Sequence, residues 1–252
     1  MVSVRSLLVA ICPIIVACPL ALAQTPPQTA PAQPSPPVWT GSFGAGLSLT
    51  SGNSDTTNVN LSFDTKYDPK TGNLFKAEGL YLWGRTEGED NANRLSLQGR
   101  FEHLLKPRVF VFGQLQYMRD PFKGVDYLIA PTGGIGYKLV DTPRTQLSAD
   151  TSLGVVWEKN PDVSVKTSAA WAAGEKLTHK LSDTATFTEL VQALWKLDDL
   201  GDAFYTFGVG LAAAITPHSQ VKVELLDTYK TKPPDGLEKN DVALLLSLVF
   251  KY

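Results

Sequence analysis

The chain has 252 residues, of which 43% are hydrophobic and 19% are charged, and its formal net charge at pH 7 is −2. This length allows one sizeable domain or two small ones. A charge so close to zero provides no basic surface for a polyanion, so the composition argues against nucleic acid as a partner.

The first 23 residues predict a secretory signal peptide. Arg5 precedes an apolar run that Pro13 and Pro19 interrupt, and Ala21–Ala23 form an A-x-A cleavage site. A retained transmembrane helix is the alternative, and the two prolines argue against it. We therefore expect residues 1–23 to be removed during export.

Both cysteines of the chain, Cys12 and Cys18, lie in this segment. Residues 15–18 resemble a lipobox, which leaves open a second interpretation in which Cys18 is the acylated first residue of a lipoprotein. We favour cleavage after Ala23, because the apolar run continues past Cys18. The exported chain then has no cysteine, which excludes disulfides, thiol chemistry and a cysteine-ligated metal.

Residues 24–37 hold six of the 17 prolines and no charge. This composition predicts a disordered or polyproline-II linker that belongs to no core. The composition changes at Val38, and no later stretch has the period of a helix. We expect residues 38–252 to form one domain.

From Trp39 onwards, apolar and polar residues alternate with a period of two in segments of ~10 residues. Clusters of Gly, Pro, Asn, Asp and Ser interrupt the alternation and predict turns between about 12 strands. The expected connections are residues 51–55, 68–73, 86–91, 106–108, 120–126, 141–144, 159–162, 182–183, 198–202, 217–219 and 232–236.

Alternation alone fits both a soluble β-sandwich and a membrane-spanning barrel. Aromatic residues at strand ends, a polar and glycine-rich opposite face, and an even number of strands favour an antiparallel up-and-down β-barrel in a bacterial outer membrane. At the periplasmic rim, which would also hold both termini, we expect Trp39, Tyr67, Phe75, Phe101, Tyr137 and Tyr252. At the outer rim we expect Trp83, Tyr117, Trp157, Trp195, Tyr205 and Tyr229.

The last strand has an unbroken apolar face over the even-numbered residues from Val242 to Tyr252. We predict that this face meets lipid. Its final residues, Leu248, Phe250 and Tyr252, are expected to form the signal that the barrel-assembly machinery recognises. Two later strands fit the pattern less well, because Glu175 and Glu189 fall on the apolar phase; a β-bulge would restore the phase, but the sequence does not give its position.

Several short stretches resemble a family of salt-induced outer-membrane proteins whose function is unknown. They are residues 47–55 (LSLTSGNSD) leading into 58–63 (NVNLSF), 133–138 (GGIGYK) and 246–252 (LSLVFKY). The resemblance covers essentially residues 39–252. It implies a monomeric outer-membrane barrel with a role in salt or osmotic response, and it supplies no catalytic residues and no substrate.

Ten charged residues are expected to point into the lumen: Asp64, Lys66, Lys76, Glu78, Arg100, Glu102, Lys138, Lys222, Glu224 and Lys251. Two interpretations remain open. Rings of charge can form an ion-selective constriction, or acidic and basic side chains can pair and fill the barrel. Because the two signs are nearly balanced, we favour the paired network, with any pore narrow and weakly selective. The leading function is thus a passive channel or a structural envelope protein.

An outer-membrane lipid hydrolase is the alternative function. It would need a His–Ser pair on the lipid-facing surface. His103, His179 and His218 fall at strand ends or turns without such a serine, and His218 and Ser219 point to opposite faces. No zinc spacing occurs, and Gly133–Gly136 lacks the helix that a nucleotide site needs. We therefore expect no enzyme, no cofactor and no metal.

Several acidic residues fall in the loops expected at the outer surface: Asp55, Glu87, Glu89, Asp90 and Asp162. They are solvated loop residues or ligands for divalent cations that bridge lipopolysaccharide, and we favour the former. Outer-membrane lipid, lipopolysaccharide and the assembly machinery are the expected partners.

Overall fold

A computed structural model describes residues 39–51, 56–86, 89–161, 163–233 and 236–252. The expected signal peptide (1–23), with Cys12 and Cys18, and the expected linker (24–37) lie outside the described residues, as do Asp55, Glu87 and Asp162 and the side chains of Glu89 and Asp90. Among the residues described, no helix is long and apolar enough to cross a membrane.

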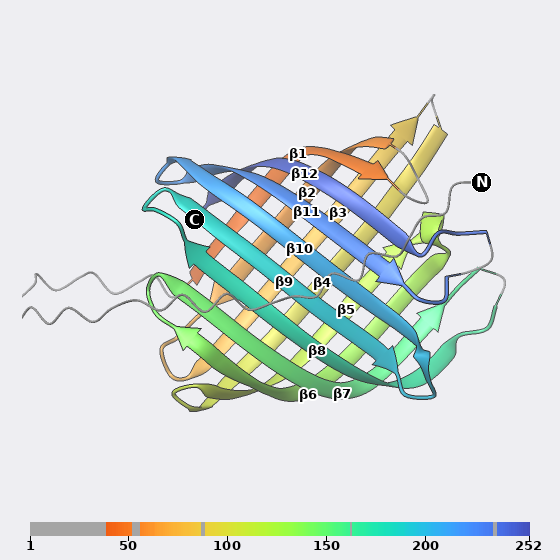
Figure 1. Cartoon of the computed structure of the whole chain (residues 1–252), viewed down its shortest axis with the longest axis horizontal. Coiled ribbons are helices and arrows are strands. Elements are labelled where there is room, and N and C mark those ends of the chain that lie inside the picture. The colour runs from red at the N-terminus through yellow and green to blue at the C-terminus, as the bar shows by residue number, and fades with distance from the viewer. Residues whose placement is uncertain (1–38, 52–55, 87–88, 162, 234–235) are drawn as a thin grey trace, which may run out of the picture. The chain divides into compact units, whose positions relative to one another are not determined.

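Twelve strands and one short 3₁₀ helix form the described part of the chain (Figure 1). The elements are β1 (Trp39–Ser51), β2 (Thr56–Tyr67), β3 (Asn73–Thr86), β4 (Glu89–Lys106), β5 (Val109–Asp120), η1 (Pro121–Lys123), β6 (Val125–Asp141), β7 (Thr145–Lys159), β8 (Lys166–Lys180), β9 (Ala185–Lys196), β10 (Asp199–Thr216), β11 (Ser219–Lys230) and β12 (Asn240–Lys251). Each strand pairs antiparallel with its chain neighbours, and β1 pairs with β12. The predicted up-and-down barrel is confirmed.

Burial along β12 identifies the two faces of the sheet. Leu245 and Val249 are 3% and 4% exposed, whereas Leu246 and Phe250 are 48% and 53% exposed. Large apolar side chains are exposed in the same alternating way on the other strands. In a sandwich these side chains would be covered by a second sheet. Here they form the outer surface of the barrel, as lipid-facing residues do.

Aromatic rows lie near both ends of the strands. We call the end that carries Tyr252 the terminal rim, where the rings of Trp39 and Tyr67 are 4.7 Å apart. The opposite end is the loop rim. There Trp171 stacks on Trp195 at 4.6 Å, and Tyr205 continues the row. The expected aromatic residues thus occupy strand ends, and the structure adds Trp171 to them.

In the described strands, no bulge restores the phase at Glu175 or Glu189. Strand β8 pairs with β7 and with β9 without any register shift, so both carboxylates remain on the outer face. Shifting β8 by one residue would move every side chain to the other face. Lys176 would then leave the lumen, where it pairs with Glu78, and Trp171 would leave the outer aromatic row.

The expected turn at residues 198–202 was also partly wrong. The connection is only Leu197–Asp198, and β10 already begins at Asp199. A register shift separates the pairing of Asp199 from that of Ala203. Asp202, which was expected in the turn, lies between these two pairings and forms an ion pair with Lys196.

Gly136 shows why the glycine run of β6 is needed. A Cβ atom at this position would lie 2.1 Å from the Phe110 ring. Phe110 and Phe112 fill the lumen side of β5, and the Arg100 guanidinium lies 3.6 Å from the Phe112 ring centre. The glycine therefore makes room for the rings that pack around Arg100, as expected of a strand glycine at a close approach.

Candidate functional site

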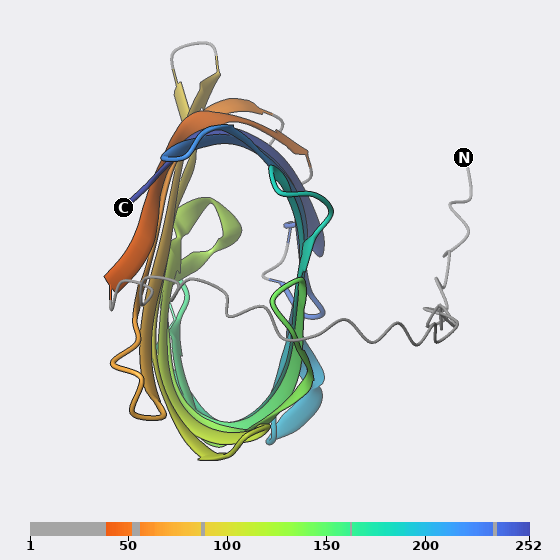
Figure 2. The same cartoon turned by 90° about the vertical axis from the view of Figure 1, so that its left-hand side faces the viewer.

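All ten predicted lumen charges lie on the inward phase of their strands. Pairing places Asp64 beside Glu78 and Lys76 beside Arg100, in the half of the barrel nearer the terminal rim. Seen down its axis, the barrel has a flattened cross-section (Figure 2). Flattening brings opposite walls close enough for side chains to meet across the lumen.

Arg100 is the centre of a first group of contacts. Its Nε donates to Glu102 Oε1 at 2.7 Å, its Nη1 to Gln114 Oε1 at 3.0 Å and its Nη2 to Asp150 Oδ2 at 2.8 Å. Lys76 Nζ also donates to Glu102, at 2.9 Å. Arg100 is 9% exposed, so its charge is compensated inside the barrel, as a buried charge requires.

A second contact spans the lumen. Lys176 Nζ on β8 lies 3.0 Å from Glu78 Oε1 on β3, although four strands separate β3 and β8 along one side of the barrel. With Arg100, it bridges walls that the sheet does not join. We call the set Lys76, Glu78, Arg100, Glu102, Asp150 and Lys176 the terminal layer. It contains three bases and three acids.

The other predicted residues stay outside this layer. Asp64 accepts a hydrogen bond from Ser42, and Lys222 pairs with Glu224 at 2.7 Å along β11. Lys138 pairs with Asp141 at 3.0 Å. The side chains of Lys66 and Lys251 are exposed near the terminal rim.

The prediction missed Asp150 and Lys176. Lys176 lies on a strand whose phase was hard to assign, because Glu175 interrupts its apolar face, and Asp150 lies on β7, opposite Gly174 of that strand. The usable signal was Lys176 itself, which is on the inward phase once β8 is taken as a regular strand.

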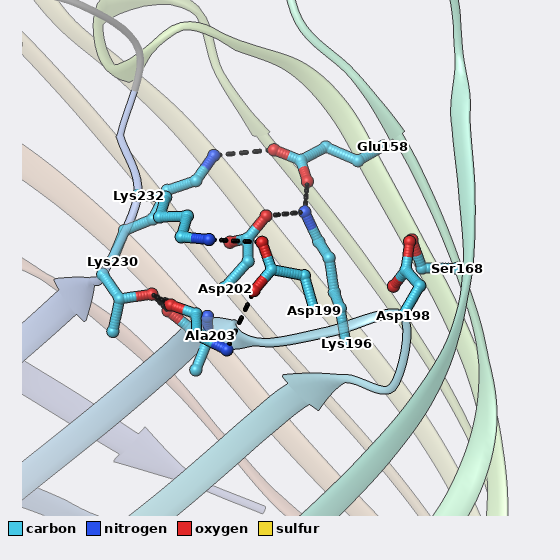
Figure 3. A network of polar contacts seen from close by, with 11 residues as sticks. Glu158, Ser168, Lys196, Asp198, Asp199, Asp202, Ala203, Lys230 and Lys232 are labelled. Atoms are coloured by element: carbon cyan, nitrogen blue, oxygen red, sulfur yellow. Dashed lines mark hydrogen bonds and ion pairs between the residues drawn. The ribbon is translucent and has the colours of Figure 1, made fainter.

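A second cluster, shown in Figure 3, lies at the loop rim. Glu158 Oε2 accepts a hydrogen bond from Lys196 Nζ at 2.5 Å, and Oε1 accepts one from Lys230 Nζ at 2.6 Å. Lys196 Nζ also donates to Asp202 Oδ2 at 2.7 Å. We call Glu158, Lys196, Asp202 and Lys230 the loop layer; they come from β7, β9, β10 and β11. A further pair, Lys232 with Asp199, lies at the surface beside it.

Burial makes the loop layer the more tightly held of the two. Glu158 is 2% exposed and Lys196 is 5% exposed. Lys230 lies 4.8 Å from the Phe204 ring centre, which adds a cation–π contact. Sequence analysis missed this cluster because its residues lie in or beside expected turns.

A cavity of ≈ 650 Å³ runs along the lumen and is lined by Glu78, Arg100 and Lys176 of the terminal layer and by Lys230 of the loop layer. Hydroxyl and amide side chains such as Ser96, Gln98 and Gln116 line it, together with Leu190 and Leu226. Pro233 and Leu237, from the connection after β11, also contribute. The lumen is thus a chamber of mixed polar and apolar lining, with ion-paired groups in both halves.

Among the described residues, the side-chain contacts of His103 and His179 include no serine. His103 Nδ1 lies 2.7 Å from Asn73 Oδ1, and the residue paired with His103 on β5 is Val111. His179 Nδ1 lies 2.7 Å from Thr145 Oγ1. The contacts found in the described part of the chain therefore do not support the hydrolase alternative. In the same part, no group of three or more His, Cys, Asp or Glu residues could hold a metal ion.

Comparison with known proteins agrees with this architecture. A family model described as "Protein of unknown function, DUF481" matches residues 43–252. The uncharacterized protein YdiY of Escherichia coli (strain K12) is 25% identical over 173 residues, 66% of this chain and 67% of that protein.

Solved structures with a similar fold are outer-membrane barrels. The NanC porin has a TM-score of 0.58 at 10% identity, covering 83% of this chain and 100% of that one. The KdgM porin has a TM-score of 0.52 at 7% identity, covering 84% and 99%. An outer membrane channel from Pseudomonas putida F1 has a TM-score of 0.53 at 11% identity, covering 89% and 100%. At these identities the likeness concerns the fold alone.

Proposed function

Because the chain belongs to DUF481, a family of proteins of unknown function, its role has to be argued from its barrel, and we propose that it is a narrow passive channel of the bacterial outer membrane. The observation that carries this proposal is the pair of bridges across the lumen, Glu78–Lys176 and Arg100–Asp150. They restrict the width of the lumen, which holds a cavity of ≈ 650 Å³. The similar solved structures include porins and an outer membrane channel.

The apolar outer surface supports the location. Exposed Leu, Phe and Trp side chains cover the barrel between its aromatic rows, and a soluble monomer rarely exposes so large an apolar surface. We place the terminal rim in the periplasm, because the connections there are short, as periplasmic turns are. Export by residues 1–23, a monomeric state and contact with lipopolysaccharide belong to the same proposal.

The exposed bridge of the terminal layer predicts that the width of the lumen depends on the salt concentration. The side chains of Lys176 and Glu78 are 51% and 40% exposed, so dissolved ions can screen their attraction. The screening length falls from about 10 Å at 0.1 M salt to about 3 Å at 1 M. A lumen that widens in concentrated salt would suit a protein that resembles a salt-induced family.

Single-channel recording in a planar bilayer tests this proposal. We expect small conductance steps that increase more steeply than the KCl concentration, because salt weakens the Glu78–Lys176 bridge. The double variant Glu78→Ala/Lys176→Ala should lose this extra salt dependence. Silence at every salt concentration would refute the channel.

The C-terminal residue is expected to act in assembly and to contribute little to stability. Tyr252 closes the barrel through its backbone, whose N–H donates to Gly41 O at 3.0 Å, and its side chain is 67% exposed. Tyr252→Ala should therefore reduce the amount of folded protein in the outer membrane several-fold while the purified barrel unfolds at the same urea concentration. Leu211→Ala, an exposed apolar change far from the C-terminus, is the control. Unchanged amounts for Tyr252→Ala would argue against an assembly signal.

A further inference from the structure

An apolar groove lies on the outer surface of β5, β6 and β7, beside the loop rim. Its walls are Tyr117, Tyr127, Ile129, Trp157 and Val165, and its volume is ≈ 450 Å³. Strand pairing places Tyr117 beside Ile129, and Ile129 beside Trp157, so these three side chains form one row across the outer face. Val165 belongs to the connection between β7 and β8.

Two basic side chains stand at the end of this groove nearer the loop rim. Arg119 follows Tyr117 on the outer face of β5, and Lys159 is paired with Tyr127. Lys159 and Arg119 lie on either side of β6. Lys159 is paired with Tyr127, whereas Arg119 lies at a register shift between Met118 and Asp120, and the long side chains of both can extend over β6. The two cationic groups can therefore reach one anion above Tyr127.

The side-chain contacts of Arg119 and Lys159 in the described part of the chain are with neutral groups, so both side chains keep their positive charge beside the groove. Arg119 is exposed and makes a long hydrogen bond of 3.5 Å to Asn93 Oδ1. Lys159 Nζ donates to the backbone carbonyl groups of Asn160 at 3.2 Å and Val163 at 2.5 Å. Carbonyl groups orient the ammonium group without neutralising it.

The distribution of charge over the outer face points to an anionic occupant. At the loop rim, the outward-facing charged residues described on the strands that form the groove are the bases Arg119 and Lys159, and the acidic Asp227 lies farther away, on β11. Toward the terminal rim, the outer face carries the carboxylates of Glu175 and Glu189 instead. A negatively charged amphiphile would thus be attracted to the groove and repelled from β8 and β9.

We propose that this groove binds a phosphorylated lipid of the surrounding leaflet. One acyl chain lies along Tyr117, Ile129 and Trp157, where it leaves water for an aromatic surface. The phosphate lies between Arg119, whose guanidinium can donate two parallel hydrogen bonds, and Lys159, which acts as a point charge. The proposal requires the barrel to be in a membrane and does not require it to conduct.

Native mass spectrometry of the full-length protein in a neutral detergent tests the site with three probes: phosphorylated lipid A, the same lipid after dephosphorylation, and inorganic phosphate. We expect the phosphorylated lipid to be retained and the other two to bind more weakly by roughly tenfold or more, because each lacks the phosphate or the acyl chains. Equal retention of the dephosphorylated lipid would overturn the proposal, as would equal retention of inorganic phosphate.

Variants locate the site. Arg119→Gln/Lys159→Gln should lower retention of the phosphorylated lipid by roughly tenfold, and Arg119→Gln alone, which leaves the Lys159 contacts intact, should lower it partly. Arg108→Gln, which removes an exposed base at the terminal rim, is the matched control and should change nothing. Full retention by the double variant would refute the assignment. Conductance in neutral bilayers should be equal for all of them, so failure of the channel would appear separately.

Discussion

Replacing Glu158 with glutamine is expected to lower the free energy of unfolding of the barrel by about 3–5 kcal/mol. The carboxylate is almost fully buried and accepts hydrogen bonds from Lys196 and Lys230. Without that charge, Lys230, whose side chain is only 12% exposed, loses the acidic partner that compensated it. Urea unfolding in phospholipid vesicles measures the loss, with the folded fraction taken from the faster-migrating band of unheated protein.

Two control variants distinguish the effect of the buried Glu158 contacts from the effect of an exposed ion pair. Asp199→Asn breaks the surface pair with Lys232 and should leave the unfolding midpoint unchanged, because exposed pairs contribute little. Glu158→Gln/Lys230→Met removes one acid and one base, leaves Lys196 with Asp202, and places an apolar side chain beside Phe204. It should regain much of the loss. If Glu158→Gln is as stable as Asp199→Asn, the loop layer does not hold the barrel together.

The second large effect is expected in the lumen, where Lys176→Ala and Glu78→Ala should give channels of opposite selectivity. The terminal layer holds three bases and three acids. Removing Lys176 leaves an excess negative charge, which favours cations, and removing Glu78 leaves an excess positive charge, which favours anions. Either change also removes the bridge across the lumen, so conductance should increase several-fold. Reversal potentials across a KCl gradient give the sign of the selectivity.

The double variant Glu78→Ala/Lys176→Ala distinguishes charge from width. It removes one base and one acid, so it should conduct as well as the single variants and select neither ion strongly. Lys66→Ala, an exposed base near the terminal rim, should change both properties little. Equal conductance of the wild type and all three bridge variants would show that the Glu78–Lys176 pair does not limit the path.

Much of the barrel could be predicted from the sequence. The alternation in residues 241–252 predicted which side chains of β12 are buried and which are exposed, and the turn clusters predicted the number of strands. This works because side chains of a strand alternate between its faces wherever the strand lies. Glu175 and Glu189 were misjudged because the polar phase was taken as strict, whereas the regular pairing of β8 and β9 leaves both carboxylates on the outer face.

The lumen network shows where local pattern is insufficient. Inward phase follows from position along a strand, so Lys76, Glu78, Arg100 and Glu102 could be assigned to the lumen without coordinates. Their partners could not. Glu78 meets a residue 98 positions away, and Arg100 meets one 50 positions away.

Period-two alternation, turn residues and an aromatic end are properties of neighbouring residues, and they suffice to specify a barrel, its strands and the faces of those strands. Which acid meets which base across the lumen depends on the stagger of all the strands and on how far the closed sheet is flattened. The stagger and the flattening are properties of the closed barrel, and the barrel closes only when β1 pairs with β12. They cannot be derived from any single pair of adjacent strands.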